Sequence, residues 1–320
     1  MNLEQLFTQH FPGYNFLFNY SLQNKSYFKI GGPAEVFFAA KKAQEAIDLL
    51  VFCKEKDIRF TIIGGASNVV IADEGISGLV LSLDFADFSV ISETDQDLLI
   101  RAEAGIKTAN LVGKAAALGG SGLEGFIGVP GVLGGAIYNN AHYLKALISD
   151  VIVEVEAFDL ESNNIINISR EKCEFAYEQS IFQKNKNFII FSATFALKKI
   201  SPDQVKQLVR DSIAKREKTQ PLDLPSCGCV FQNPANTDGL RQLFPQFAQL
   251  EFVPAGFLIE AAGLKGIKEG DIQVSEKHAA FFVNLGHGTA KDVVKLVEKV
   301  KAVVLEKFGV ILKEEIFYLK

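Results

Sequence analysis

The stretch 122–141, GLEGFIGVPGVLGGAIYNNA, sets Gly128, Gly131, Gly134 and Gly135 within one apolar run. Glycine weakens the interior of a helix or strand, because it loses the most backbone freedom on folding and has no side chain to pack. So many glycines indicate backbone that must lie close against something flat. A broad planar cofactor and a second, closely packed backbone explain the run equally well.

A second glycine-rich stretch, IIGGASNVV at 62–70, follows directly on a short apolar strand-like run. Gly64 and Gly65 let backbone approach a ligand, and successive N–H groups can hold an anion. Ser67 and Asn68 add side-chain donors, although a plain tight turn would use the same residues. The pattern lacks the spacing of a Rossmann fingerprint and the Gly-Lys-Ser/Thr of a Walker loop.

A third feature, SCGCVFQNP at 226–234, places Cys227 and Cys229 on either side of Gly228. Structural zinc sites use paired ligands in spacings such as C-x-x-C, and no second pair or histidine lies nearby in the sequence. A disulfide is unexpected in a reducing compartment. We therefore predict no metal, and a tight turn at Gly228 that carries one reactive thiol.

The composition is that of an ordinary globular protein, with 320 residues, 48% hydrophobic and 22% charged. The length fits two or three domains. A net charge of -5 excludes a general attraction to nucleic acid or to an anionic membrane. The sequence shows neither a signal peptide pattern nor a long apolar span. We expect a cytoplasmic monomer whose partners are small molecules only.

Strand-like and helix-like segments are intermixed along the chain, which predicts the α+β class. Apolar spacing and capping residues predict amphipathic helices at 41–57, 107–119, 201–220 and 288–309. The pattern at 24–41 predicts a strand, a Gly-Gly-Pro turn and a second strand, and 310–319 predicts a closing strand. The last helix carries one apolar stripe, formed by Val293, Val297, Val300, Val304 and Phe308.

Seven motifs, in order and spread over nearly the whole chain, resemble those of the UDP-N-acetylenolpyruvoylglucosamine reductase (MurB) family. The short segment between AYEQSIF and SCGCVF resembles the family's shorter type, which lacks a substrate-covering insertion. The seven motifs are NKSYFKIGGPAE, IIGGASNVVIADEGISGLV, GLEGFIGVPGVLGGAIYNNA, SCGCVFQNP, AGFLIEAAGLKG, VSEKHAAFFVNLG and GVILKEEI.

This resemblance implies an FAD-binding fold of the vanillyl-alcohol-oxidase type followed by a C-terminal α+β substrate domain. It implies FAD-binding subdomains at 1–82 and 83–212 and a substrate domain at 213–320. NADPH would reduce the FAD, which would then reduce UDP-N-acetylglucosamine enolpyruvate to UDP-N-acetylmuramate for peptidoglycan synthesis. The implied FAD contacts are Lys29, Ile30, Gly31, Ile63, Gly64, Gly65, Ala66, Ser67, Asn68, Gly128, Val129, Pro130, Gly131, Gly134 and Gly135.

Two catalytic residues are implied by the motifs. Cys229 stands where the family usually has a serine that protonates the substrate, and a thiol is more acidic than an alcohol and can donate a proton. Glu315 matches the carboxylate of a motif like L-x-x-E-I. In a strand it would share a face with Ile311, Phe317 and Leu319, and a carboxylate among apolar side chains is common at active sites.

Glu178, in AYEQSIF, stands where the family has an arginine and reverses its charge. Loss of a charged hydrogen bond costs about 1.5–3 kcal/mol, and repulsion at roughly 4 Å adds about 4 kcal/mol. Together they slow the chemical step by roughly three to five decades. A nearby cation, with Lys172, Lys184 and Lys186 as candidates, could compensate.

Otherwise Glu178 indicates a flavin- and UDP-sugar-binding protein with weak or lost reductase activity. A flavin oxidase of the wider fold is a third hypothesis, and it would act on a different substrate.

Two milder departures from the motifs are Ala280 in place of asparagine and His142 in place of glycine. The implied substrate contacts are Tyr177, Lys218, Asn233 and His278.

Overall fold

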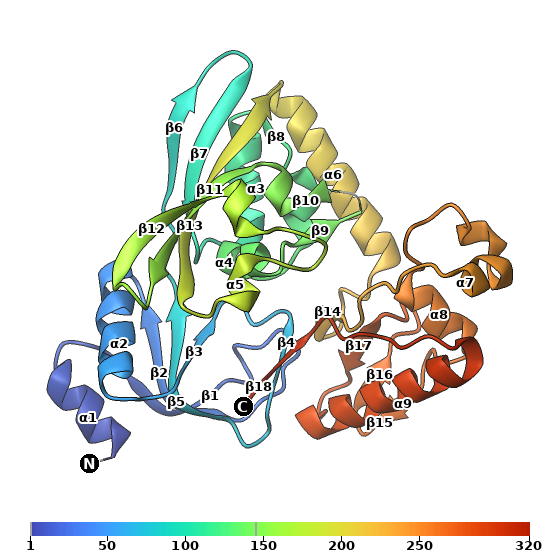
Figure 1. Ribbon diagram of the computed structural model, residues 1–320, viewed down its shortest axis with the longest axis horizontal. Coiled ribbons are helices and arrows are strands. Elements are labelled where there is room, and N and C mark those ends of the chain that lie inside the picture. The colour runs from blue at the N-terminus through green and yellow to red at the C-terminus, as the bar shows by residue number, and fades with distance from the viewer. Residues whose placement is uncertain (1, 145) are drawn as a thin grey trace. The chain divides into compact units, whose positions relative to one another are not determined.

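The computed structural model describes residues 2–144 and 146–320, which form two compact units (Figure 1). Each unit is assembled from separate stretches of chain, so residues far apart in the sequence share a core. The first unit runs up to Tyr20 and continues with Ala34–Gly65 and Ser77–Arg216; the second contains Ser21–Pro33, Ala66–Ile76 and Glu217–Lys320. The predicted α+β class is confirmed.

A small sheet with the strand order β1-β2-β5-β3 opens the first unit. Strands β3 and β5 run parallel, and β5 is buried along most of its length, which explains its nearly continuous apolar sequence. The helix predicted at 41–57 is confirmed as α2. The elements are α1 (Leu3–His10), β1 (Leu17–Ser21), β2 (Pro33–Ala40), α2 (Ala43–Glu55), β3 (Phe60–Ile63) and β5 (Ile76–Leu83).

A larger antiparallel sheet with the order β12-β11-β13-β7-β6 forms the rest of the first unit, with β8 pairing with the end of β13. The central strand β13 is buried over 189–195 because it has neighbours on both sides. The strands are β6 (Phe88–Glu93), β7 (Asp97–Glu103), β8 (Gly120–Ser121), β11 (Ile152–Asp159), β12 (Asn164–Ser169) and β13 (Phe188–Lys199).

Helices and a short hairpin accompany this sheet, and α4 packs against β13 and β7 (Figure 1). The predicted helices at 107–119 and 201–220 are confirmed as α3 and α6. These elements are α3 (Thr108–Ala117), α4 (Leu133–Tyr138), β9 (His142–Tyr143), β10 (Ala146–Leu147), α5 (Ile181–Lys184) and α6 (Pro202–Thr219).

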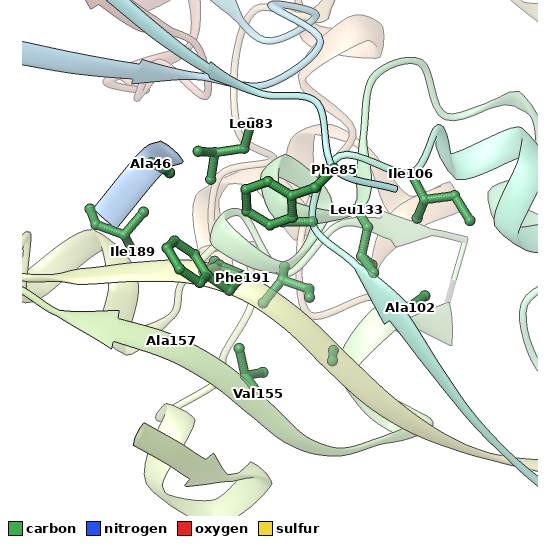
Figure 2. Close-up of a cluster of buried hydrophobic side chains, with 14 of the residues drawn as sticks. Ala46, Leu83, Phe85, Ala102, Ile106, Leu133, Val155, Ala157, Ile189 and Phe191 are labelled. Carbon is green, nitrogen blue, oxygen red and sulfur yellow. The ribbon is translucent and has the colours of Figure 1, made fainter. Parts of the chain in front are cut away.

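Side chains from both sheets meet in one hydrophobic core (Figure 2). Leu83 from β5 and Ala46 from α2 lie beside Ile189 from β13, and the rings of Phe85 and Phe191 pack edge to face with their centroids 5.2 Å apart. Edge-to-face packing of this kind adds to the free energy gained by burial. The first unit is therefore held together by one core that lies under both of its sheets.

The second unit contains a sheet with the order β14-β17-β16-β15 and a parallel pair, β4 with β18. Helix α9 packs against β15, β16 and β4, and its predicted stripe is buried except for half-buried Phe308. The elements are β4 (Val69–Ile71), β14 (Ser226–Cys229), α7 (Asp238–Leu243), α8 (Ala255–Ala261), β15 (Lys268–Glu269), β16 (Ile272–Val274), β17 (Phe281–Asn284), α9 (Ala290–Phe308) and β18 (Phe317–Leu319).

Two strand predictions are wrong in part. The closing strand is limited to β18, because its ladder partner β4 is short, and 310–316 makes only an isolated bridge. Ile311 is 77% exposed, so the face predicted to be apolar opens to solvent there. The first strand expected within 24–41 is absent, because the chain near Lys29, whose φ is 58°, is turned rather than extended. No helix among the described residues is long and apolar enough to cross a membrane.

The first prediction concerns the start of α9. The hydroxyl of Thr289 accepts a hydrogen bond from the Asp292 amide, and the Asp292 carboxylate accepts one from the Thr289 amide. Loss of such a cap costs about 1 kcal/mol. Thr289→Ala should lower the free energy of unfolding by this amount in urea titrations and speed amide exchange in α9, whereas Thr289→Ser should change neither. Equal exchange rates in both variants would contradict the assignment.

Candidate functional site

In the first unit, the turn after β3 touches the segment that precedes α4, backbone to backbone. A Cβ atom added at Gly65 would stand 2.4 Å from the Cα of Gly131, and one at Gly64 would stand 2.8 Å from Cγ2 of Val132. Neither glycine can be replaced without moving its neighbour, which is the use of glycine at a close approach. Close packing on the Gly131 backbone at Gly65, and on the Val132 side chain at Gly64, therefore accounts for these glycines.

Gly135 lies in the same neighbourhood but has open space beside it. It is exposed in α4, and a Cβ there would meet nothing within 4 Å, whereas Gly134 packs on Ala104, which a Cβ would approach to 3.1 Å. The amide nitrogen of Gly135 lies 3.9 Å from the position of a Cβ on Gly64. The backbone of α4 is therefore unobstructed at Gly135, next to the Gly64 turn.

Gly128 serves a different purpose. A Cβ at this position would stand 2.2 Å from Cδ of Arg216, whose buried guanidinium donates to the carbonyls of Gly128 and Gly125 at 3.3 and 3.4 Å. The guanidinium also lies 4.2 Å above the Tyr143 ring. The Arg216 side chain therefore holds this loop. The other cofactor candidates in this unit are Ile63, which is buried, Val129, which is half-buried, and Pro130, which is exposed.

The second unit contains the remaining cofactor candidates. Lys29 is exposed, and its ammonium donates to the Asn24 carbonyl at 3.0 Å. Gly31, with φ of 127°, packs on Ile71, where a Cβ would stand 2.7 Å from that side chain's own Cβ. The amide of buried Asn284 donates to the carbonyl of Phe28 at 3.0 Å and fixes this loop. Beside these, Ile30 and Ala66 are buried and Ser67 is half-buried.

The Cys227-Gly228-Cys229 segment is an irregular strand, not the predicted tight turn. It forms β14, whose pairing with β17 shifts register between Ser226 and Cys229, and Gly228 has φ of 81° at this bulge. A bulge inserts an extra residue and re-aims the side chains around it. Cys227 lies in the hydrophobic core, where burial raises the pKa of its thiol, whereas Cys229 is partly exposed.

The structure brings Glu315 next to the Cys229 strand. The Glu315 amide donates to the Val230 carbonyl at 2.8 Å, and its carbonyl accepts from the Asn68 side chain at 3.1 Å. The neighbouring carboxylate of Glu314 instead forms an ion pair with Lys301 at 3.2 Å. Asn68 and Glu315 therefore meet within the second unit, and the Glu315 amide bonds the residue that follows Cys229.

Glu178 is paired, but with none of the lysines proposed as candidates. Nδ1 of His142 lies 2.5 Å from Oε1 of Glu178, whose side chain is 4% exposed. Lys184 instead pairs with Glu174 at 2.6 Å, and Lys186 contacts the Tyr138 hydroxyl. The two positions that depart from the family motifs, 142 and 178, are thus in contact with each other.

The remaining substrate candidates, Asn233, His278 and Lys218, differ in their exposure and in their hydrogen-bond partners. The side-chain oxygen of Asn233 accepts from the Ala255 amide at 2.8 Å and caps α8, so it serves the fold. Nδ1 of His278 lies 3.3 Å from the amide of Ala280, and burial lowers the pKa of this imidazole. Lys218 is exposed. Among the described residues, no group of three metal-binding side chains gathers.

Comparison with known proteins decides the family. Residues 34–169 match the FAD binding domain family, and 220–319 match the C-terminal domain of UDP-N-acetylenolpyruvoylglucosamine reductase. The chain is 36% identical to the reductase of that name from Caldanaerobacter subterraneus subsp. tengcongensis, over 93% of this chain and 91% of the relative. The reductase from Chlamydia muridarum is also 36% identical, over 92% of this chain and 91% of its own length.

The chain belongs to the UDP-N-acetylenolpyruvoylglucosamine reductase family. A solved structure of the MurB reductase from Thermus caldophilus covers 96% of this chain and 99% of its own, with a TM-score of 0.74 and 26% identity. The predicted family, the FAD-binding fold with its C-terminal domain, and the FAD cofactor are confirmed. The protein is an FAD-dependent oxidoreductase.

The residues present in the reductase fit this cofactor. The FAD-binding match contains both the Gly64 turn and the segment that leads into α4, and Gly135 leaves the bare backbone that a planar ring system needs. The C-terminal match contains Cys229 and Glu315. The cofactor candidates at 63–68 and 128–135 therefore fall within the FAD-binding match, whereas Lys29, Ile30 and Gly31 precede it.

The second prediction tests the open space at Gly135. Gly135→Leu should lower the affinity of the apoprotein for FAD by roughly tenfold or more, since the added side chain occupies that space. Stability should not fall, because leucine favours a helix over glycine by up to about 1 kcal/mol. Gly113→Leu, at an exposed position of α3 that is equally open, is the matched control. Flavin fluorescence titration measures both affinities, and equal values would contradict the assignment.

Proposed function

We propose that the protein reduces UDP-N-acetylglucosamine enolpyruvate to UDP-N-acetylmuramate with NADPH, a step of peptidoglycan precursor synthesis. The observation that carries the proposal is the hydrogen bond from the Glu315 amide to the carbonyl of Val230, the residue that follows Cys229, within the domain that matches the reductase family. Residues 1–82 and 83–212 would hold FAD, and 213–320 would hold the UDP-sugar. The proposal includes a monomer that works in the cytoplasm.

The residues of the Gly64 turn and of the segment leading into α4 would hold FAD, which would supply hydride transfer between NADPH and the enolpyruvyl double bond. The protein must then protonate the neighbouring carbon. We assign this proton to the thiol of Cys229, which is partly exposed on a strand whose bulge separates it from the buried Cys227. A proton donor placed in this way contributes roughly 10²–10⁴-fold to a rate.

Glu315 supports the proton transfer in this proposal. Its backbone is held on both sides, by Val230 through the amide and by Asn68 through the carbonyl. A carboxylate on such a fixed segment can orient a donor or return a proton to it without a costly rearrangement. In this proposal Glu314, which forms an ion pair with Lys301, contributes to stability and not to the reaction.

The pairing of Glu178 with His142 bears on the hypothesis of a protein that has lost its activity. That hypothesis assumed an uncompensated negative charge, whereas a histidine nitrogen stands 2.5 Å from the carboxylate. Nothing in the comparisons supports the alternative, since the relatives that match over nine-tenths of the chain are named as reductases. The reductase is therefore the one function we propose.

The third prediction tests this function and the acid together. The FAD-loaded protein should be bleached by NADPH without oxygen and should regain its oxidised spectrum on addition of the enolpyruvyl substrate. Cys229→Ala should keep the bleaching step and slow reoxidation by roughly 10²–10⁴-fold, and Cys229→Ser should recover part of that loss. Cys53→Ala, at a buried thiol of the first unit, is the control. Failure of the wild type to reoxidise would exclude the reaction, and full activity of Cys229→Ala would exclude the acid.

The fourth prediction separates the two neighbouring carboxylates. Glu315→Gln should slow reoxidation by substrate by at least roughly tenfold, because a group that acts in the transition state is lost. Glu314→Gln should leave this rate unchanged and should cost no more than about 1 kcal/mol of stability, the usual worth of a partly exposed ion pair. Stopped-flow absorbance gives the rates. A slower Glu314→Gln beside an unaffected Glu315→Gln would reverse the assignment.

A further inference from the structure

The contact between His142 and Glu178 joins a buried carboxylate to a more exposed imidazole. The Glu178 side chain is 4% exposed and that of His142 is 25% exposed, so the imidazole forms the accessible side of the pair. Nδ1 is the ring nitrogen that faces the carboxylate, which leaves Nε2 for another partner. The Tyr177 ring lies beside the imidazole, with the two centroids 5.1 Å apart.

The turn that carries Glu178 is held in a conformation that a glutamate rarely adopts. Ala176 and Gln179 exchange backbone hydrogen bonds across Tyr177 and Glu178, and Glu178 has φ of 55°. The left-handed region is costly for a residue with a Cβ and persists only where the surroundings impose it. Here the side chain of Gln183 donates to the Glu178 carbonyl at 3.1 Å.

Buried Asn140 fixes the two partners of the pair relative to each other. Its side-chain nitrogen donates to the carbonyl of Ala176, at the base of the Glu178 turn, at 2.8 Å. Its side-chain oxygen accepts from the Ser149 amide at 3.3 Å, and Asn140 lies two residues before His142. One fully buried amide therefore ties the segment of the imidazole to the turn of the carboxylate.

The buried carboxylate of Glu178 needs a partner, and the His142 imidazole lies in a position to be that partner. A buried ionised carboxylate costs several kcal/mol unless a cation or several donors satisfy it. Nδ1 of the His142 imidazole stands 2.5 Å from Oε1 of this carboxylate, and the His142 side chain is itself 25% exposed. A carboxylate that holds a histidine ring by one nitrogen and so directs the other is a common way to position an imidazole.

We propose that His142 contacts the carboxylate of the enolpyruvyl substrate through Nε2, and that Glu178 is the positioning residue that holds its ring. This inference rests on the proposed function. Helix α4 leads from Gly135 towards His142, and its six residues span only about 9 Å. His142 is thus within reach of a substrate that reacts at a cofactor on the bare backbone of α4.

Substrate affinity tests the inference without relying on turnover. In the FAD-loaded protein, His142→Gln and Glu178→Gln should each weaken binding of the enolpyruvyl substrate roughly 10- to 100-fold, the worth of a charged hydrogen bond. Calorimetric titration measures this binding. The double variant should bind no more weakly than the weaker single variant, because both residues serve one contact.

The matched control is Glu174→Gln, which removes an exposed carboxylate from the same loop and should leave substrate binding unchanged. If Glu178→Gln does not fold, Glu178→Gly removes the carboxylate with a residue that accepts φ of 55°. Wild-type affinity in either single variant, or losses that multiply in the double variant, would overturn the inference. A wild type that binds no substrate would overturn the proposed function instead.

Discussion

The backbones at Gly65 and Gly131 touch, since a Cβ on the first would stand 2.4 Å from the Cα of the second. This contact sets where α4 begins, because the chain reaches the helix within a few residues of Gly131. Helix α4 in turn leads to Asn140 and His142. The bare surface at Gly135 and the imidazole next to Glu178 both follow from that one approach of two backbones, which only glycine permits.

The second unit positions two candidate residues, Cys229 on β14 and Glu315 on the irregular segment before β18. The bulge at Gly228 places Cys227 in the core and leaves Cys229 partly exposed. The segment that contains Glu315 then pairs with the residues that follow Cys229. Backbone hydrogen bonds, which are less yielding than side-chain contacts, therefore control the separation of the proposed acid and its carboxylate partner.

Electrostatics explain how a glutamate can stand at a position where the family motif has an arginine. The reversal of charge would be costly in isolation, since a buried charge needs a partner. His142 supplies that partner, and it also stands where the motifs differ. The two departures are therefore best understood as one change, made at two positions that are in contact in the folded chain.

The sequence by itself determined the α+β class, the strongly periodic helices and the order of the motifs, because local spacing and residue type carry that information. It also indicated which glycines mattered, although not which of them pack on backbone and which face open space. Tertiary structure alone decided that Cys227-Gly228-Cys229 is a bulged strand, that Arg216 holds a loop, and that His142 meets Glu178. Each of these depends on contacts between segments far apart in the chain, which no local pattern encodes.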